Sequence, residues 1–146
     1  GYRMILRPGG KNIDRIAADA NVILSAITGK AALRVFLRSN VEIVSTGRTL
    51  AEVVKYIPFM AVKYGIAAEI LEGQFKLLVI TEYRLSQYRN SIAKAEGLMK
   101  PLDPDDVDLL ALAISLDVPV WTNDRDFKPT GVECHTTAEL LKILDL

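Results

Sequence analysis

Apolar residues along the chain fall into two alternating patterns: short continuous runs, and longer stretches with helical spacing. Short apolar runs are typical of strands in a parallel sheet, because helices cover both faces of such a sheet. The run over residues 77–80 is apolar throughout, which predicts a strand buried on both faces. The predicted strands cover residues 15–20, 41–45, 77–80 and 118–122, with 131–135 as a candidate fifth.

Stretches with apolar residues three and four positions apart predict helices between these strands. The helix from Arg48 is expected to kink or end at Pro58, and the next, over residues 61–75, to be broken at Gly65 and Gly73. Further helices are predicted over residues 21–27, 30–38 and 82–99, from Pro104 to near Leu116 with Asp103 as cap, and after a capping box of Thr136 and Glu139. The alternation predicts an α/β fold with a largely parallel sheet.

The chain has 146 residues, of which 50% are hydrophobic, and this is enough for one domain with a sizeable core. We expect that domain to span residues 13–146, and residues 1–12 to form an N-terminal tail or an edge strand. No apolar run approaches the roughly 20 residues of a membrane helix, and the first residues lack a signal-peptide pattern. The protein is therefore expected to be cytoplasmic, with no membrane contact.

Cysteine, histidine and net charge narrow the possible chemistry. Cys134 and His135 are the single residues of their types, which excludes an internal disulfide, a zinc site and the usual serine or cysteine triad. Any bound metal must then be held by oxygen ligands. Eighteen basic and eighteen acidic residues give a net charge of zero, so a polyanion would have to meet a local basic patch.

Acidic residues stand at the ends of several predicted elements. Asp19 and Asp124 fall at the carboxyl ends of predicted strands, where the crevice of an open parallel sheet lies. Glu52 and Asp106 lie near helix starts that can reach the same rim. Carboxylates a few ångströms apart repel one another and must take up protons or a cation. Oxygen ligands favour Mg²⁺ or Mn²⁺, which suits phosphodiester hydrolysis.

All but one of these acids also have a simpler explanation. Acids in the first turn of a helix are stabilised by capping and by the helix dipole, which accounts for Asp103, Asp105 and Asp106 without catalysis. Asp124 could belong to an ordinary turn rich in Asn and Asp, and Glu52 could be a solvated surface residue. Asp19 lacks such a role. The order in which the acids occur carries more weight than any one of them.

Four segments together resemble the PIN domain nucleases. They are DANVILSAI at residues 19–27, TLAEV around Glu52, DVDLLALAISL from Asp106 and VWTNDRDF at residues 120–127. They follow the order used in that family and cover nearly the whole domain. Asp124 follows Asp106 by 18 positions, which matches the family spacing and selects Asp106 among its acidic neighbours.

The resemblance implies a three-layer α/β/α fold with a central sheet of four to five strands. It also implies a quartet of Asp19, Glu52, Asp106 and Asp124 around one or two Mg²⁺ or Mn²⁺ ions, with RNA hydrolysed to a 3′-hydroxyl and a 5′-phosphate. Asp126 matches a further ligand position, while Asn21 and Thr122 match positions that orient the ligands.

Partners implied by the resemblance are RNA, an antitoxin and a second copy of the chain. Many small members of the family are toxins of type II toxin–antitoxin pairs, whose antitoxin often inserts a segment or an arginine into the acidic pocket. Candidate contacts to RNA phosphates are Arg34, Arg38, Arg48 and Arg125. Arg34 and Arg38 are better explained as a solvated helix face than as contacts to RNA.

Two other classes of function compete with a nuclease. A catalytically silent domain of the same fold would bind RNA or a protein, although full retention of the quartet speaks against it. A receiver-like or dehalogenase-like phosphoryl enzyme would also be acidic and built on a parallel sheet. It is disfavoured because the segment from Asp19 to Asn21 lacks the second aspartate that those phosphatases use, and no suitably placed lysine follows.

Overall fold

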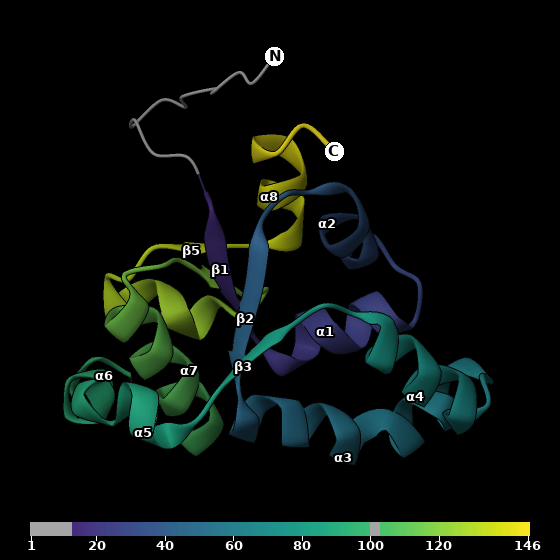
Figure 1. The fold of residues 1–146 in the computed structure, drawn as a ribbon, viewed down its shortest axis with the longest axis horizontal. Coiled ribbons are helices and arrows are strands. Elements are labelled where there is room, and N and C mark those ends of the chain that lie inside the picture. Colours follow the sequence, from purple (N-terminus) through teal and green to yellow (C-terminus); the bar gives the residue numbers. More distant parts are fainter. Residues whose placement is uncertain (1–12, 100–102) are drawn as a thin grey trace.

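A computed structural model describes residues 13–99 and 103–146 and contains a five-stranded sheet in the order β3-β2-β1-β4-β5 (Figure 1). Each pair of neighbouring strands is parallel, which confirms the prediction of an α/β fold with a parallel sheet. The predicted tail or edge strand at residues 1–12 lies outside the described residues. The strands are β1 (Arg15–Ala18), β2 (Glu42–Thr46), β3 (Thr81–Tyr83), β4 (Val120–Trp121) and β5 (Cys134–His135).

The strand order reverses between β1 and β4. From β1 the chain builds outward through β2 to β3, and it then returns to place β4 and β5 on the other side of β1. A reversal of this kind opens a crevice at the carboxyl ends of the two central strands, because their connections leave in opposite directions. Asp19 directly follows β1, and Asp124 follows β4. The two acids therefore flank the crevice.

Helices cover both faces of the sheet, which confirms the three-layer α/β/α arrangement (Figure 1). Ile16 and Ala18 of β1 face one core, while Ala17 between them faces the other, as the alternation of side chains along a strand requires. The first face carries α1 (Ala20–Ile27), α2 (Ala32–Arg38), α3 (Gly47–Tyr64), α4 (Ala68–Leu77) and α8 (Thr137–Ile143). The second carries α5 (Leu85–Tyr88), the short turn η1 (Arg89–Ser91), α6 (Ile92–Leu98) and α7 (Pro104–Leu116).

Helix α7 begins and ends where the sequence predicts. Asp103 is its cap and Pro104 its first residue, and the helix closes at Leu116. Six consecutive or nearly consecutive residues of α7 are buried, because the helix lies between the sheet and the pair α5 and α6. The predicted capping box of Thr136 and Glu139 at the start of α8 is also present.

The strand predicted over residues 77–80 is absent from the described sheet. Leu77 closes α4 and Val79 is 85% exposed, while the strand that does form, β3, begins at Thr81 on the edge of the sheet. A short apolar run does not distinguish a strand from the end of a helix, and here α4 continues through Gly73 instead of breaking there. The helix predicted over 82–99 is correspondingly divided into α5, η1 and α6.

Pro58 neither ends α3 nor divides it. The helix runs through Pro58 to Tyr64 and ends at Gly65, whose φ of 64° is the left-handed conformation that glycine adopts readily. Proline removes the hydrogen bond to the carbonyl of Val54, a residue on the exposed side of α3 where water can take that place. Val53 and Ile57 remain packed in the core and hold the helix on its course.

No single helix among the described residues is long and apolar enough to cross a membrane; α1 and α2 reach that composition only as a pair bent by 83°.

Candidate functional site

Asp19 is the most constrained of the candidate site residues. It caps α1, where its carboxylate accepts the backbone N–H of Val22 at 2.9 Å, and it is only 7% exposed. The same carboxylate accepts the hydroxyl of Thr122, which follows β4 on the other side of the crevice. Burial raises the pKa of Asp19, the hydrogen bonds from Thr122 and Val22 oppose this, and the negative charge of Asp124 raises it further.

Thr122 links Asp19 to Asp124. The hydroxyl that donates to Asp19 also accepts the backbone N–H of Asp124 at 3.0 Å. Asp124 in turn accepts the backbone N–H of Asp126 at 2.9 Å and caps the short helix η2 (Arg125–Thr130). One buried threonine thus fixes the spacing of two acids that lie far apart in the sequence, and Asp124 and Asp126 both present exposed side chains.

Asp106 lies in the first turn of α7 and is half-buried. Its pKa is raised from 3.8 to about 7, first by burial and then by the charges of Asp103, Asp124, Asp19 and Glu52. Like charges at this range favour the protonated form of each carboxyl. Asp106 therefore lies close enough to the other three predicted acids for their charges to affect its pKa.

Glu52 reaches the same region from α3. Its pKa is raised from 4.5 to about 7 by burial, followed by the charges of Asp105 and Asp103, a hydrogen bond with Asp105 and the charge of Asp19. The acids of the predicted quartet thus converge from the ends of β1 and β4 and from two helices. Asp103 and Asp105, which the sequence pattern assigns to helix capping, add their charge to the same site.

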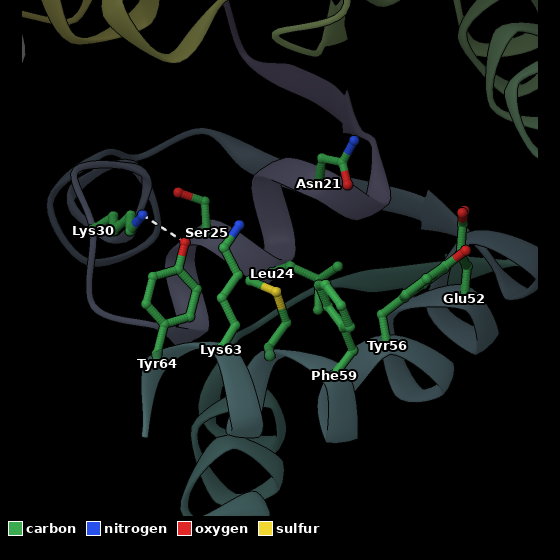
Figure 2. Close-up of a pocket in the computed structure, with 10 residues that line it drawn as sticks. Asn21, Leu24, Ser25, Lys30, Glu52, Tyr56, Phe59, Lys63 and Tyr64 are labelled. Atoms are coloured by element: carbon green, nitrogen blue, oxygen red, sulfur yellow. Dashed lines mark hydrogen bonds between the residues drawn. The ribbon is translucent and has the colours of Figure 1, made fainter. Parts of the chain in front are cut away.

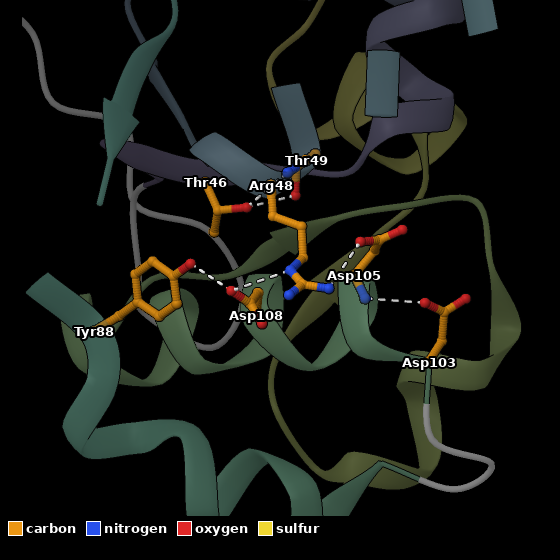
Figure 3. A network of polar contacts seen from close by, with 7 residues as sticks. All are labelled: Thr46, Arg48, Thr49, Tyr88, Asp103, Asp105 and Asp108. Atoms are coloured by element: carbon orange, nitrogen blue, oxygen red, sulfur yellow. Dashed lines mark hydrogen bonds and ion pairs between the residues drawn. The ribbon is translucent and has the colours of Figure 1, made fainter. Parts of the chain in front are cut away.

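A polar network beside the quartet, absent from the sequence predictions, joins α3, α5 and α7 (Figure 3). The guanidinium of Arg48 lies 3.7 Å from Asp105 and 3.8 Å from Asp108, while the hydroxyl of Tyr88 donates to Asp108 at 2.5 Å. Arg48 was a candidate for binding RNA phosphate, but in this structure it faces acids of its own chain. No local sequence signal reveals this pairing, because α3 and α7 meet only in the fold.

The remaining candidate residues lie in more open positions. Arg34 and Arg38 are exposed on α2, with a guanidinium nitrogen of Arg34 at 3.5 Å from the carbonyl oxygen of Leu146. Arg125 is exposed directly after Asp124. Asn21, in the first turn of α1, lines the same groove as Glu52 (Figure 2).

The chemistry of the acidic site fits a hard divalent cation. Its donors are all carboxylate or amide oxygens, which suit Mg²⁺ and Mn²⁺, and burial together with neighbouring negative charges raises the pKa values of Glu52 and Asp106. Across residues 13–99 and 103–146, no three Asp, Glu, His or Cys side chains are already close enough to hold one ion. Binding would therefore require the more exposed carboxylates to turn inward.

Comparison with protein families matches residues 17–145 to a family described as the PIN domain. No curated protein sequence matches the chain. The fold is similar to that of a DNA-bound VapBC from Salmonella typhimurium, with 19% identity, a TM-score of 0.64 and coverage of 86% of this chain and 99% of the other.

Two further solved structures share the fold. VapBC-1 from nontypeable Haemophilus influenzae is 21% identical with a TM-score of 0.62, covering 85% of this chain and 98% of the other. VapC20 from Mycobacterium tuberculosis, described as a toxin that cleaves the sarcin-ricin loop, is 16% identical with a TM-score of 0.56, covering 80% of this chain and 95% of the other. At these identities the likeness concerns the fold.

Proposed function

Because this chain belongs to the PIN domain family, we propose that it is a divalent-metal-dependent endoribonuclease that hydrolyses RNA phosphodiester bonds. The observation that carries the proposal is the convergence of four carboxylates on one crevice, where Thr122 links Asp19 to Asp124 and the charge of Asp19 reaches both Glu52 and Asp106. Glu52 and Asp106 have pKa values raised to about 7, in part by the charges of the other acids. A cluster of this kind is destabilised without a cation and stabilised by one, as a metal-dependent hydrolase requires.

In this proposal the quartet of Asp19, Glu52, Asp106 and Asp124 holds Mg²⁺ or Mn²⁺, with Asp126 as a further ligand. When bound, such an ion would supply a nucleophilic water and would neutralise charge on the phosphoryl oxygens. Glu52 and Asp106 release their protons as the ion enters, so metal affinity increases as the pH rises through about 7.

Thr122 and Asn21 have supporting roles in the proposed mechanism. Thr122 donates to one carboxylate oxygen of Asp19 while the backbone N–H of Val22 donates to the other, and together they fix the orientation of this carboxylate. Asn21 stands beside Glu52 at the groove, where its amide can orient a ligand or a phosphate. Arg125, exposed next to Asp124, is a candidate to contact an incoming phosphate.

We also propose an antitoxin partner, since solved relatives of the same fold are VapBC assemblies, one of them bound to DNA. The structural likeness covers 98% and 99% of the matched chains in these two assemblies. Homodimerisation remains part of the same proposal. Co-expression with the neighbouring reading frame, followed by size-exclusion chromatography, tests both.

The test of nuclease activity is cleavage of single-stranded and hairpin RNAs with Mg²⁺, with Mn²⁺ and with a chelator. Asp19→Asn and Asp124→Asn are expected to abolish metal-dependent cleavage. Asp117→Asn is the matched control, because Asp117 is exposed at the far end of α7 in a left-handed conformation that asparagine accepts. Unchanged cleavage in the two site variants would contradict the proposal.

A catalytically silent binding domain is the second candidate. It is favoured because, among the described residues, no three acidic side chains are close enough to coordinate one ion. Calorimetric titration with Mn²⁺ separates the two. The nuclease proposal expects a binding site that is lost in Asp106→Asn and retained in Asp117→Asn. A silent domain would show no such site in the unmodified protein.

A further inference from the structure

A groove of about 490 Å³ runs between α1 and α3 and is continuous with the acidic site (Figure 2). Glu52, a member of the quartet, lies at one end of the groove, and Lys30 and Tyr64 lie at the other. From Glu52 to Tyr64 the helix α3 rises by about 18 Å. A stacked nucleic-acid strand advances by about 3.4 Å per nucleotide, so the groove is several nucleotides long.

Two aromatic side chains on the α3 wall of the groove are exposed. Tyr56 is 41% exposed and Phe59 is 63% exposed, one helical turn apart; Phe59 rises from α3 toward α1, and Tyr56 extends toward Glu52 (Figure 2). They are not needed for the core, because Val53 and Ile57 supply the buried stripe of the same helix. Exposed rings along a groove offer flat faces on which bases can stack.

The end of the groove away from the quartet is basic. The ammonium of Lys30 lies 2.8 Å from the hydroxyl of Tyr64 and 4.5 Å from its ring centroid, and the ammonium of Lys63 lies 5.4 Å from that centroid. The hydrogen bond from Lys30 lowers the pKa of Tyr64. Lys30 also borders a second depression, along α2, which Arg34 and Arg38 line. The positive charge therefore continues beyond the groove.

We propose that this groove binds an unpaired RNA strand next to the scissile bond, with bases stacked on Tyr56 and Phe59 and a backbone phosphate held by Lys30 and Lys63. The inference rests on the proposed function, since it assigns the acidic end to cleavage. Only an unpaired strand fits, because bases inside a duplex are stacked on one another and cannot offer their faces to a ring.

The combination of rings and ammonium groups favours RNA over an apolar protein helix as occupant. A groove that binds an amphipathic helix needs only an apolar surface. This groove also carries two lysines at its far end, and these suit a phosphate. The groove thereby adds a specificity for single strands to the cleavage site.

The test measures binding of a short fluorescent polyuridine RNA by anisotropy, in an Asp124→Asn background that prevents cleavage. Phe59→Ala is expected to weaken binding about tenfold, since stacking on one ring contributes roughly 1–3 kcal/mol. The Lys30→Ala, Lys63→Ala double variant should flatten the slope of log affinity against log salt by about 0.7 for each lysine. A blunt-ended RNA duplex, whose bases are all paired, should bind more weakly than polyuridine.

Controls come from the same chain. Val62→Ala removes an apolar side chain that is 86% exposed on α3 but does not line the groove, and Lys94→Ala removes a lysine from α6 on the other face of the sheet. Both should bind RNA like the parent, and Lys30→Arg should restore the salt slope. Thermal unfolding checks that each variant folds.

Failure of this inference differs from failure of the proposed function. If the wild-type chain cleaves RNA while the groove variants bind RNA like the Asp124→Asn parent, the groove assignment is wrong and the nuclease stands. If groove variants lose binding but the wild-type chain never cleaves, the groove is an RNA site on a silent domain. Equal losses in Phe59→Ala and Val62→Ala would also overturn the assignment.

Discussion

Helices α1 and α7 both begin with an aspartate cap, but the two aspartates have different surroundings. Asp103 is exposed and accepts the N–H of Asp105 within its own turn at 3.0 Å. Asp19 caps α1 in the same way, yet it is 7% exposed and also accepts the hydroxyl of Thr122, which is 103 residues away in the sequence. Capping accounts for the hydrogen bonding of Asp103, whereas a buried carboxylate held from across the sheet needs a further explanation.

The difference identifies what separates a structural acid from a candidate ligand. At the start of α7 the candidate ligand is Asp106 in the first turn, whose pKa is raised to about 7 by burial and by its acidic neighbours. At the start of α1 the cap itself is the candidate ligand. The position of an acid in its helix therefore does not tell whether it is a candidate metal ligand. Its contacts with residues on the other side of the crevice are more informative.

The largest effect is expected when the carboxylate of the Asp19 cap is replaced by an amide. The same replacement at the Asp103 cap is the comparison. Asp19→Asn should lower RNA cleavage by roughly 10²- to 10³-fold, since a bound ion supplies several kcal/mol of transition-state stabilisation. Asp103→Asn should leave cleavage within a few-fold, because asparagine caps a helix as well as aspartate does. Initial rates with Mn²⁺ measure both, and equal losses would erase the distinction between the caps.

Removing the hydroxyl of Thr122, which donates to Asp19 and has no counterpart at Asp103, should have the next largest effect. Thr122→Val keeps the shape of the side chain but deletes the donor to Asp19 and the acceptor of the Asp124 N–H. Residues that orient metal ligands typically contribute 10- to 100-fold in metal affinity or activity, so Mn²⁺ affinity measured by calorimetry should fall by about that factor. Thr122→Ser should recover most of it. If the serine variant is as weak as the valine variant, packing and not the hydroxyl is responsible.

Sequence patterns predict the fold well where one signal dominates. Asp103, Pro104 and the apolar residues that follow define α7, and the carboxyl ends of β1 and β4 place Asp19 and Asp124 at the crevice. The prediction fails at residues 77–80, where an apolar run is the exposed end of α4 and the linker after it, and at Pro58, where core packing outweighs the lost hydrogen bond.

The candidate site is less accessible to local patterns. Four aspartates crowd the start of α7, and helix capping explains acids there equally well; the selection of Asp106 came from the family spacing. The contacts of Arg48 with Asp105 and Asp108 form only because α3 meets α7. The hydrogen bond from Thr122 to Asp19 forms only because β4 lies beside β1. Such pairings are properties of the tertiary structure.

Asp106, in the first turn of α7, should also make the folding stability depend on pH. A carboxyl whose pKa is raised in the folded state stabilises the fold fully below its unfolded pKa, and that contribution is lost as the pH rises through the folded pKa. For Asp106 the loss therefore develops between pH 3.8 and about 7. Without divalent metal, Asp106→Asn should raise Tm relative to the parent more at pH 8 than at pH 4. Adding Mn²⁺ should reverse the order at pH 8.

The matched control for this comparison is Glu72→Gln, which changes an exposed acid on α4 away from the acidic site. Its effect on Tm should vary little between the two pH values. A similar pH dependence in both variants would mean that the shift reflects overall charge and not the site.

The smallest effect is expected from Arg48, which partly neutralises the α7 acids beside Glu52. Arg48→Ala should cost at most about 1 kcal/mol of folding stability, because its ion pairs at 3.7 and 3.8 Å are partly exposed. Its electrostatic effect reaches further: Asp105, which already raises the pKa of Glu52, would lose its cation, so Glu52 would hold its proton to a higher pH. The pH midpoint of Mn²⁺ binding should therefore move upward, and Arg48→Lys should restore it. A phosphate-binding arginine would instead weaken RNA binding and leave that midpoint unchanged, so the two measurements together decide which role Arg48 has.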